Sequence, residues 1–145
     1  MKQGDKDLLL RDLCARLPYG VKCKIHTHVH GDTVYKLTDI RDNGYTCGTV
    51  KDKYAWAVLD ISEVKPYLFP LSSMTKEQKR EYHQSTSKDI DMLQDVILER
   101  INGINNTNKH AIAYNGIDWL NAHHFDYRGL IEKGLAIDCT NLNIY

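Results

Sequence analysis

The sequence predicts an α+β protein, in which one leading helix precedes a small antiparallel β-barrel or curled sheet and C-terminal helices follow. Three observations indicate this class. Residues 21–30 alternate between apolar and polar side chains, which is the period of a half-buried strand. Similar short segments, separated by turn residues, continue to residue 71. On both sides of this stretch, the apolar residues recur at helical spacing instead.

The length of 145 residues fits a single domain, with a leading helix in 1–20, the β part in 21–71 and a helical part with an extended tail in 72–145. The 19 basic residues are balanced by 19 acidic ones. A neutral chain lacks the long-range field that drives nonspecific DNA binding. The composition therefore argues against a large nucleic-acid footprint.

The leading helix is expected over residues 5–17. Its charged residues Arg11, Asp12 and Arg16 should point away from the core, because the apolar residues share one face of the helix. The Pro-Tyr-Gly sequence at 18–20 ends the helix. The apolar stripe at helical spacing consists of Leu9, Leu10, Leu13, Cys14 and Leu17.

The β part is expected to hold five short strands joined by hairpins. This order suits an SH3-like barrel, and several meandering sheets would fit as well. Glycine and asparagine mark turns at 31–32 and 42–44, and a brief turn at 60–63 precedes the last strand. Pro66 and Pro70 confine that strand to an edge of the sheet. The strands are expected at 21–30, 34–40, 45–50, 54–59 and 64–71.

The remainder of the chain reads as helical. Thr75 and Gln78 form a capping box, so that a helix begins at the residue after Thr75. Asp126 is expected to start a last short helix that ends at Gly134. The expected helices cover residues 76–82, 88–101, 116–125 and 126–134, with an interruption at 83–87, and an extended tail at 135–145 adds an edge strand or lies in a groove.

The four cysteines, Cys14, Cys23, Cys47 and Cys139, include no CxxC pair, which excludes a zinc ribbon or a thioredoxin-type site. Cys14 and Cys23 fall on apolar faces and are expected in the core. The first residues form a charged amphipathic segment and not a signal peptide, and no apolar run reaches transmembrane length. We therefore expect a cytoplasmic protein with reduced cysteines.

His26, His28 and His30 lie on one face of the first expected strand, where alternate side chains are about 7 Å apart. Two such imidazoles can share a zinc ion, with further ligands supplied from elsewhere in the chain. The alternative is an exposed polar strand face with neutral histidines. Lys22 and Lys24 extend the same face, so a nucleic-acid-binding barrel surface is a further alternative.

Residues 119–128 hold the densest group of aromatic, imidazole and guanidinium side chains. Tryptophan, tyrosine and arginine are typical of the hot spots of protein interfaces. The structural alternative is that Trp119 and Leu120 dock this helix on the barrel, with the histidines beside the contact. The residues expected to bind a partner are Trp119, His123, His124, Tyr127 and Arg128.

No pattern predicts catalysis. The sequence has no phosphate-binding glycine loop, no dinucleotide fingerprint and no serine nucleophile elbow. Asp118, Asp126 and Glu132 lie near two histidines and could make an acid/base pair, but carboxylates near helix starts are usually caps. We therefore expect no cofactor, with zinc on the histidine strand as the exception.

Three stretches together carry a resemblance to known proteins: LLLRDLCARLPYG (8–20), VKPYLFPLSSM (64–74) and WLNAHHFDYRGLIEKGLAID (119–138), which cover roughly a third of the chain. They resemble a family of short proteins of gut-bacterial phages and mobile elements. The resemblance implies a genomic context and supplies no catalytic residues.

The sequence therefore favours a non-catalytic binding or adaptor module of phage or mobile-element origin, which binds a protein partner in the cytoplasm of a bacterial host cell. A small barrel would offer an open edge or groove to such a partner. The two alternatives are a nucleic-acid-binding small barrel and a histidine-metal protein or enzyme. No membrane partner is expected.

Overall fold

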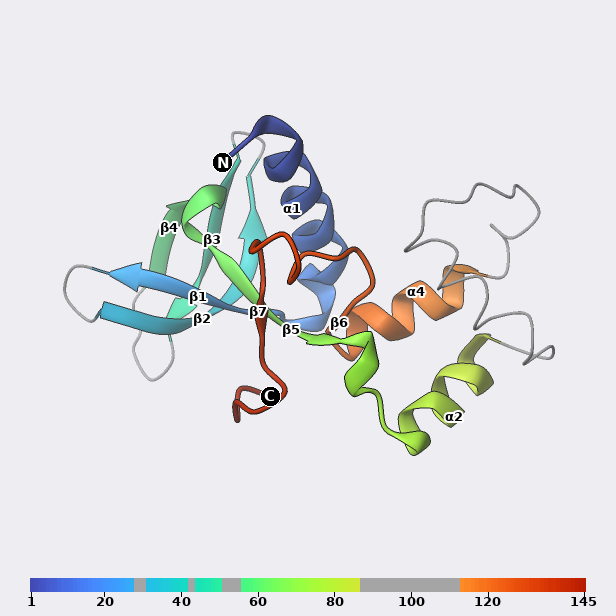
Figure 1. Ribbon diagram of the computed structural model, residues 1–145. Coiled ribbons are helices and arrows are strands. Elements are labelled where there is room, and N and C mark those ends of the chain that lie inside the picture. Colours follow the sequence, from blue (N-terminus) through green and yellow to red (C-terminus); the bar gives the residue numbers. More distant parts are fainter. Residues whose placement is uncertain (28–30, 42–43, 51–55, 87–112) are drawn as a thin grey trace.

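The fold is that of a computed structural model, which describes residues 1–27, 31–41, 44–50, 56–86 and 113–145. It confirms the α+β class, with an N-terminal helix, a mixed sheet and a C-terminal helix. Figure 1 shows the first helix against the sheet, with the two later helices packed together at one end of the molecule. None of the helices in the described ranges has both the length and the apolar character needed to cross a bilayer.

Helix α1 (Gln3–Arg16) leads into a short 3-10 helix, η1 (Leu17–Tyr19), which ends at the left-handed Gly20. Leu9 and Leu13 are fully buried against the sheet, as the apolar stripe predicted. The predicted outer face was wrong in part, because Asp12 and Arg16 are also fully buried.

The burial of Asp12 and Arg16 follows from contacts on a second side of α1. The C-terminal segment packs there, where Leu8 meets a cluster around Leu68 and Leu130. The prediction of a buried Cys14 was also wrong, because this side chain is exposed. Helix α1 therefore packs on two sides, and Asp12 and Arg16 lie on the second.

The first four strands form an antiparallel meander, as the alternating pattern predicted. Val21, Cys23 and Ile25 are buried under α1, while His26 on the opposite face is exposed. The turn predicted at 31–32 was wrong, because these residues already pair with the first strand. The four strands are β1 (Lys22–Thr27), β2 (Gly31–Ile40), β3 (Tyr45–Val50) and β4 (Trp56–Asp60).

Strand β5 (Lys65–Pro70) follows a capped 3-10 turn, η2 (Ile61–Glu63), and changes its partner along its length. It pairs antiparallel with β1 at residues 65–66, then parallel with β7 (Ile137–Asp138) and with β6 (Phe125–Asp126). The sheet therefore runs β4-β3-β2-β1-β5-β6, and it is an open mixed sheet. The barrel form of the fold prediction was wrong.

The prediction that prolines confine this strand to an edge was also wrong. Its hydrogen bonds to the C-terminal segment use other residues, because the Phe69 amide donates to the carbonyl of His124 at 2.9 Å and the Leu68 carbonyl accepts from the amide of Cys139 at 3.0 Å. Pro66 and Pro70 need to donate no bond there. Proline is thus tolerated within the sheet because each pairing is short.

In the C-terminal half, a 3-10 turn η3 (Leu71–Ser73) precedes α2 (Lys76–Thr86), whose start has the predicted capping box of Thr75 and Gln78. Helix α4 (Ala113–Ala122) packs on α2. The helix predicted at 88–101 lies outside the described residues. The tail does add a strand, β7, as one of its two predicted arrangements required.

The short helix predicted from Asp126 to Gly134 was wrong. The chain leaves α4 through His124, which has a φ of 59°, and forms β6 and then a series of turns. The Asp126 carboxylate accepts hydrogen bonds from three amides of the following turn, at 3.2 Å from Arg128, 3.0 Å from Leu130 and 2.8 Å from Ile131. The residue caps this segment, here called the 126–134 loop, without starting a helix.

Candidate binding site

A buried ion pair joins α1 to the C-terminal half of the chain. The Arg16 guanidinium donates to the Asp12 carboxylate through Nε at 2.8 Å and through Nη2 at 3.2 Å. The same guanidinium donates to the carbonyl of Phe125 at 2.7 Å and to that of Leu120 at 3.5 Å. Buried charges need such partners, because the desolvation cost is otherwise too large. The pair therefore fixes the end of α4 and β6 against α1.

A second guanidinium approaches the same carboxylate from the 126–134 loop. Arg128 Nε lies 3.5 Å from Asp12 Oδ1, and the Arg128 side chain is 18% exposed. Its Nη2 donates to the Tyr127 hydroxyl at 2.7 Å, and its guanidinium carbon lies 4.8 Å from the Tyr127 ring centre. The Tyr127 hydroxyl in turn donates to Asn121 at 3.0 Å. Two arginines thus share one carboxylate, which leaves one positive charge without a counter-charge in this network.

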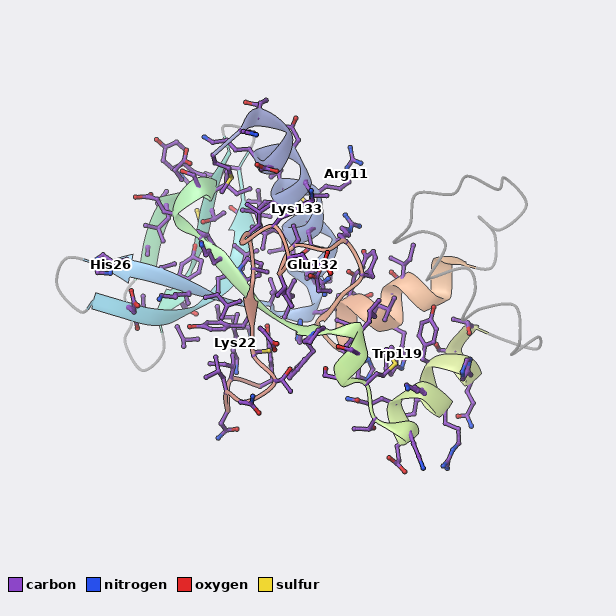
Figure 2. The ribbon with its side chains drawn as sticks, in the orientation of Figure 1. Arg11, Lys22, His26, Trp119, Glu132 and Lys133 are labelled. Carbon is purple, nitrogen blue, oxygen red and sulfur yellow. The ribbon has the colours of Figure 1, made fainter. Side chains whose placement is uncertain are left out.

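Beside this network lies a surface cavity of about 760 Å³ between α1, α4 and the 126–134 loop, here called the α1–loop cavity. Its volume falls in the range of small-molecule and peptide side-chain sites. Figure 2 shows Arg11 on α1 and the neighbouring Glu132 and Lys133 on the loop. The cavity is lined by Leu8, Arg11, Ile117, Tyr127, Arg128, Gly129, Glu132 and Lys133.

The lining combines cations with apolar surface. Arg11, Arg128 and Lys133 are its basic side chains, and Glu132 is its acidic one. Within the described ranges, neither Arg11 nor Lys133 has a carboxylate at ion-pair distance. The cavity therefore offers donors to an anionic group beside apolar side chains.

The structure separates the five residues expected to bind a partner. Tyr127 and Arg128 line the cavity, whereas Trp119, His123 and His124 do not. Trp119 stacks on the His123 ring with centres 3.8 Å apart. It also lies 5.5 Å from the Tyr82 ring of α2 and 5.8 Å from the Phe125 ring. These contacts favour the docking alternative, although α4 docks on α2 and β6 and not on a barrel.

His124 is buried, with an exposed fraction of 7%, and its ring stacks on Tyr145 with centres 4.0 Å apart. Its Nδ1 has no hydrogen-bond partner among the described residues. Burial lowers the pKa of His124 from 6.5 to about 4, with smaller contributions from the charge of Arg16, from His123 and from Lys22. The ring is therefore neutral near pH 7, and it is part of the core.

The tail covers the lysine at the start of β1. The Tyr145 hydroxyl donates to the carbonyl of Tyr67 at 3.0 Å and accepts from the backbone amide of Lys22 at 3.0 Å. The Lys22 ammonium donates to the carbonyl of Ile144 and lies 5.2 Å from the Tyr145 ring centre. Figure 2 places Lys22 beside the C-terminal segment. Lys22 therefore has partners within the chain.

Lys24 and His26 both contact Asp32 of β2. Lys24 forms an ion pair with its carboxylate, and His26 Nδ1 lies 3.0 Å from Asp32 Oδ1. The nucleic-acid alternative therefore depends on two lysines, Lys22 and Lys24, that each have an intramolecular partner. For the metal alternative, His28 and His30 lie outside the described residues. In the ranges described, no three histidine, cysteine, aspartate or glutamate side chains gather as metal ligands.

Sequence reasoning missed the residues around Tyr127 and Arg128, namely Arg11, Asp12, Arg16 and Lys133. One signal was available for two of them, because Asp12 and Arg16 have the i, i+4 spacing of an ion pair on a helix. Comparison with protein-family models, with curated proteins and with solved structures found no match. The function is therefore argued from the site itself.

Proposed function

We propose that the protein is a non-catalytic binding module and that the α1–loop cavity receives part of a protein partner. The observation that carries the proposal is that hydrogen bonds hold the side chains of Tyr127 and Arg128 in place at this cavity. Tyrosine and arginine are enriched among residues that dominate binding energy. A side chain already fixed in one orientation loses less entropy on binding, so the pair is suited to recognition.

The chemistry of the nearby carboxylates supports binding over catalysis. Asp12 is paired with two guanidinium groups, and Asp126 accepts three backbone hydrogen bonds. Both carboxylates are thus engaged in structural contacts, which leaves the donors of the cavity as its main chemical feature. Glu132 lines the cavity as a single acidic group.

The proposal includes the setting of a phage or mobile element in the cytoplasm of a bacterial host. The resemblance of residues 8–20, 64–74 and 119–138 to proteins of such elements supports the origin. The four cysteines are all free thiols, three of them buried, which is typical of proteins from reducing compartments.

A photo-crosslinking amino acid in place of Glu132, at the cavity rim, tests the proposal in host-cell lysate. The expected result is a crosslinked host or phage protein that disappears when Arg11 and Lys133 are both changed to alanine. A matched control changes Lys79 and Arg80, which are exposed on α2 and carry the same two charges. An unchanged crosslink in the Arg11/Lys133 variant, or no crosslink at all, would contradict a binding role for this cavity.

A further inference from the structure

We infer that the segment received by the α1–loop cavity is an acidic peptide, in which carboxylate side chains stand next to a large apolar residue. The inference rests on the proposed function, and it adds the chemical class of the partner. It follows from three properties of the cavity, namely its charge, the free donor of Arg128 and its apolar walls.

The first property is a local excess of positive charge in a neutral chain. The cavity and the network beneath it hold four cations, Arg11, Arg16, Arg128 and Lys133. Three carboxylates, those of Asp12, Asp126 and Glu132, lie with them. The site thus carries one net positive charge, although the chain as a whole holds 19 basic and 19 acidic residues. Such a patch attracts an acidic segment and disfavours a basic one.

The second property is the fixed orientation of the Arg128 guanidinium group. Its Nε faces Asp12 and its Nη2 donates to Tyr127, so the plane of the guanidinium is set from two sides. Its Nη1 has no hydrogen-bond partner among the described residues. A guanidinium presents its donors in a rigid plane that matches the two oxygens of a carboxylate. Arg128 can therefore bind an incoming carboxylate without first being ordered.

The third property is the apolar part of the lining. Leu8, Ile117 and the Tyr127 ring are partly buried walls of the same cavity. A fully hydrated anion would leave these surfaces in contact with water, whereas an apolar side chain beside the carboxylate would cover them. The volume of about 760 Å³ suits a few side chains of an extended segment.

Glu132 gives the site a direction. Glu132 is exposed, and it lines the same cavity as the three basic side chains. It would repel a second carboxylate placed against it and accept a hydrogen bond from a peptide amide. We therefore expect the carboxylates of the segment to bind the basic side chains and not to lie against Glu132.

A random peptide library selected on the immobilised full-length protein tests the inference. Selected peptides are expected to be enriched in aspartate and glutamate next to leucine, phenylalanine or tryptophan. They should not be retained by the variant in which Arg11 and Lys133 are both glutamine, and they should be retained by the control with glutamine at Lys79 and Arg80.

The enriched peptide is then measured by fluorescence anisotropy. Replacing Arg11 and Lys133 with glutamine should weaken binding about tenfold, as two partly screened charge contacts imply, and added salt should weaken binding of the wild-type protein. An Ile117→Asn variant provides the second readout, because it makes the apolar wall polar and leaves the charge of the cavity unchanged.

The outcomes separate the inference from the proposed function. Peptides without acidic residues, whose binding is lost in Ile117→Asn, would overturn the acidic class while keeping a peptide-binding cavity. Binding that neither variant changes would place the peptide elsewhere and overturn both. A selection that yields no enriched peptide would also overturn both.

Discussion

Replacing Asp12 with asparagine is expected to lower the free energy of unfolding by about 3–5 kcal/mol, which is the cost of removing one partner from a buried ion pair. Asp12 and Arg16 are both fully buried, and asparagine keeps the volume while it removes the charge. The Arg16 guanidinium keeps two carbonyl acceptors, which places the cost toward the lower end of this range. The partly exposed contact with Arg128 adds less than about 1 kcal/mol.

Urea unfolding followed by far-ultraviolet circular dichroism measures this change, and the denaturant slope should stay constant if the unfolded state is unaltered. Asp7→Asn is the matched control, since Asp7 is exposed on the same helix and bonds only to the amide of Gln3 in the described part of the chain. The control should cost less than about 0.5 kcal/mol. A loss below about 1 kcal/mol for Asp12→Asn would refute the view that this pair joins the two halves of the protein.

Three further changes test other parts of the fold. Gly48→Ala should destabilise the protein by about 3 kcal/mol or more in thermal unfolding, because a Cβ there would lie 2.6 Å from a ring carbon of Tyr35 and closer still to a backbone oxygen. The control Gly4→Ala has open space around the new methyl group and should be neutral or slightly stabilising. The pKa of His124 is about 4 in the folded protein against 6.5 in the unfolded chain, so the unfolded state takes up the proton first as the pH falls, and the free energy of unfolding should drop by about 3 kcal/mol between pH 6.5 and 4. The variant His124→Asn, in which asparagine tolerates the positive φ, should lose this part of the pH dependence. An unchanged pH profile in this variant would contradict the burial of a neutral ring. Tyr145→Phe removes a hydroxyl that bonds two backbone groups and should cost about 1–2 kcal/mol in urea unfolding. The control Tyr19→Phe, at an exposed ring, should cost nothing measurable. Equal effects of the two variants would argue against the tail contact.

The local parts of the fold were predictable from the sequence, because each has a periodic pattern. The alternation in residues 21–30 predicted β1 and its buried face, and the pair Thr75 and Gln78 predicted the start of α2. The open form of the sheet was not predictable in this way. It depends on β5 pairing with β6 and β7, which lie more than fifty residues further along the chain and contribute only two residues each. Two-residue strands have no period to detect.

The candidate site was predictable only in part. Tyr127 and Arg128 stood out by residue type, but the same criterion selected Trp119 and His123, which belong to the α2–α4 contact. Arg16 was assigned to solvent because the apolar residues of α1 fit one stripe. A helix packed on two sides buries residues outside that stripe, and the second surface comes from the distant C-terminal segment. Only the three-dimensional arrangement brings Arg128 next to Asp12.

We expect the partner to bind in the α1–loop cavity. The most direct test is to follow the backbone amide signals of the ¹⁵N-labelled protein by nuclear magnetic resonance while the peptide selected from the library is added. If the peptide binds in this cavity, the largest shifts occur at Gly129, Glu132 and Lys133, with small shifts along α2. Shifts concentrated on the outer face of β1 and β2, with the 126–134 loop unaffected, would contradict it.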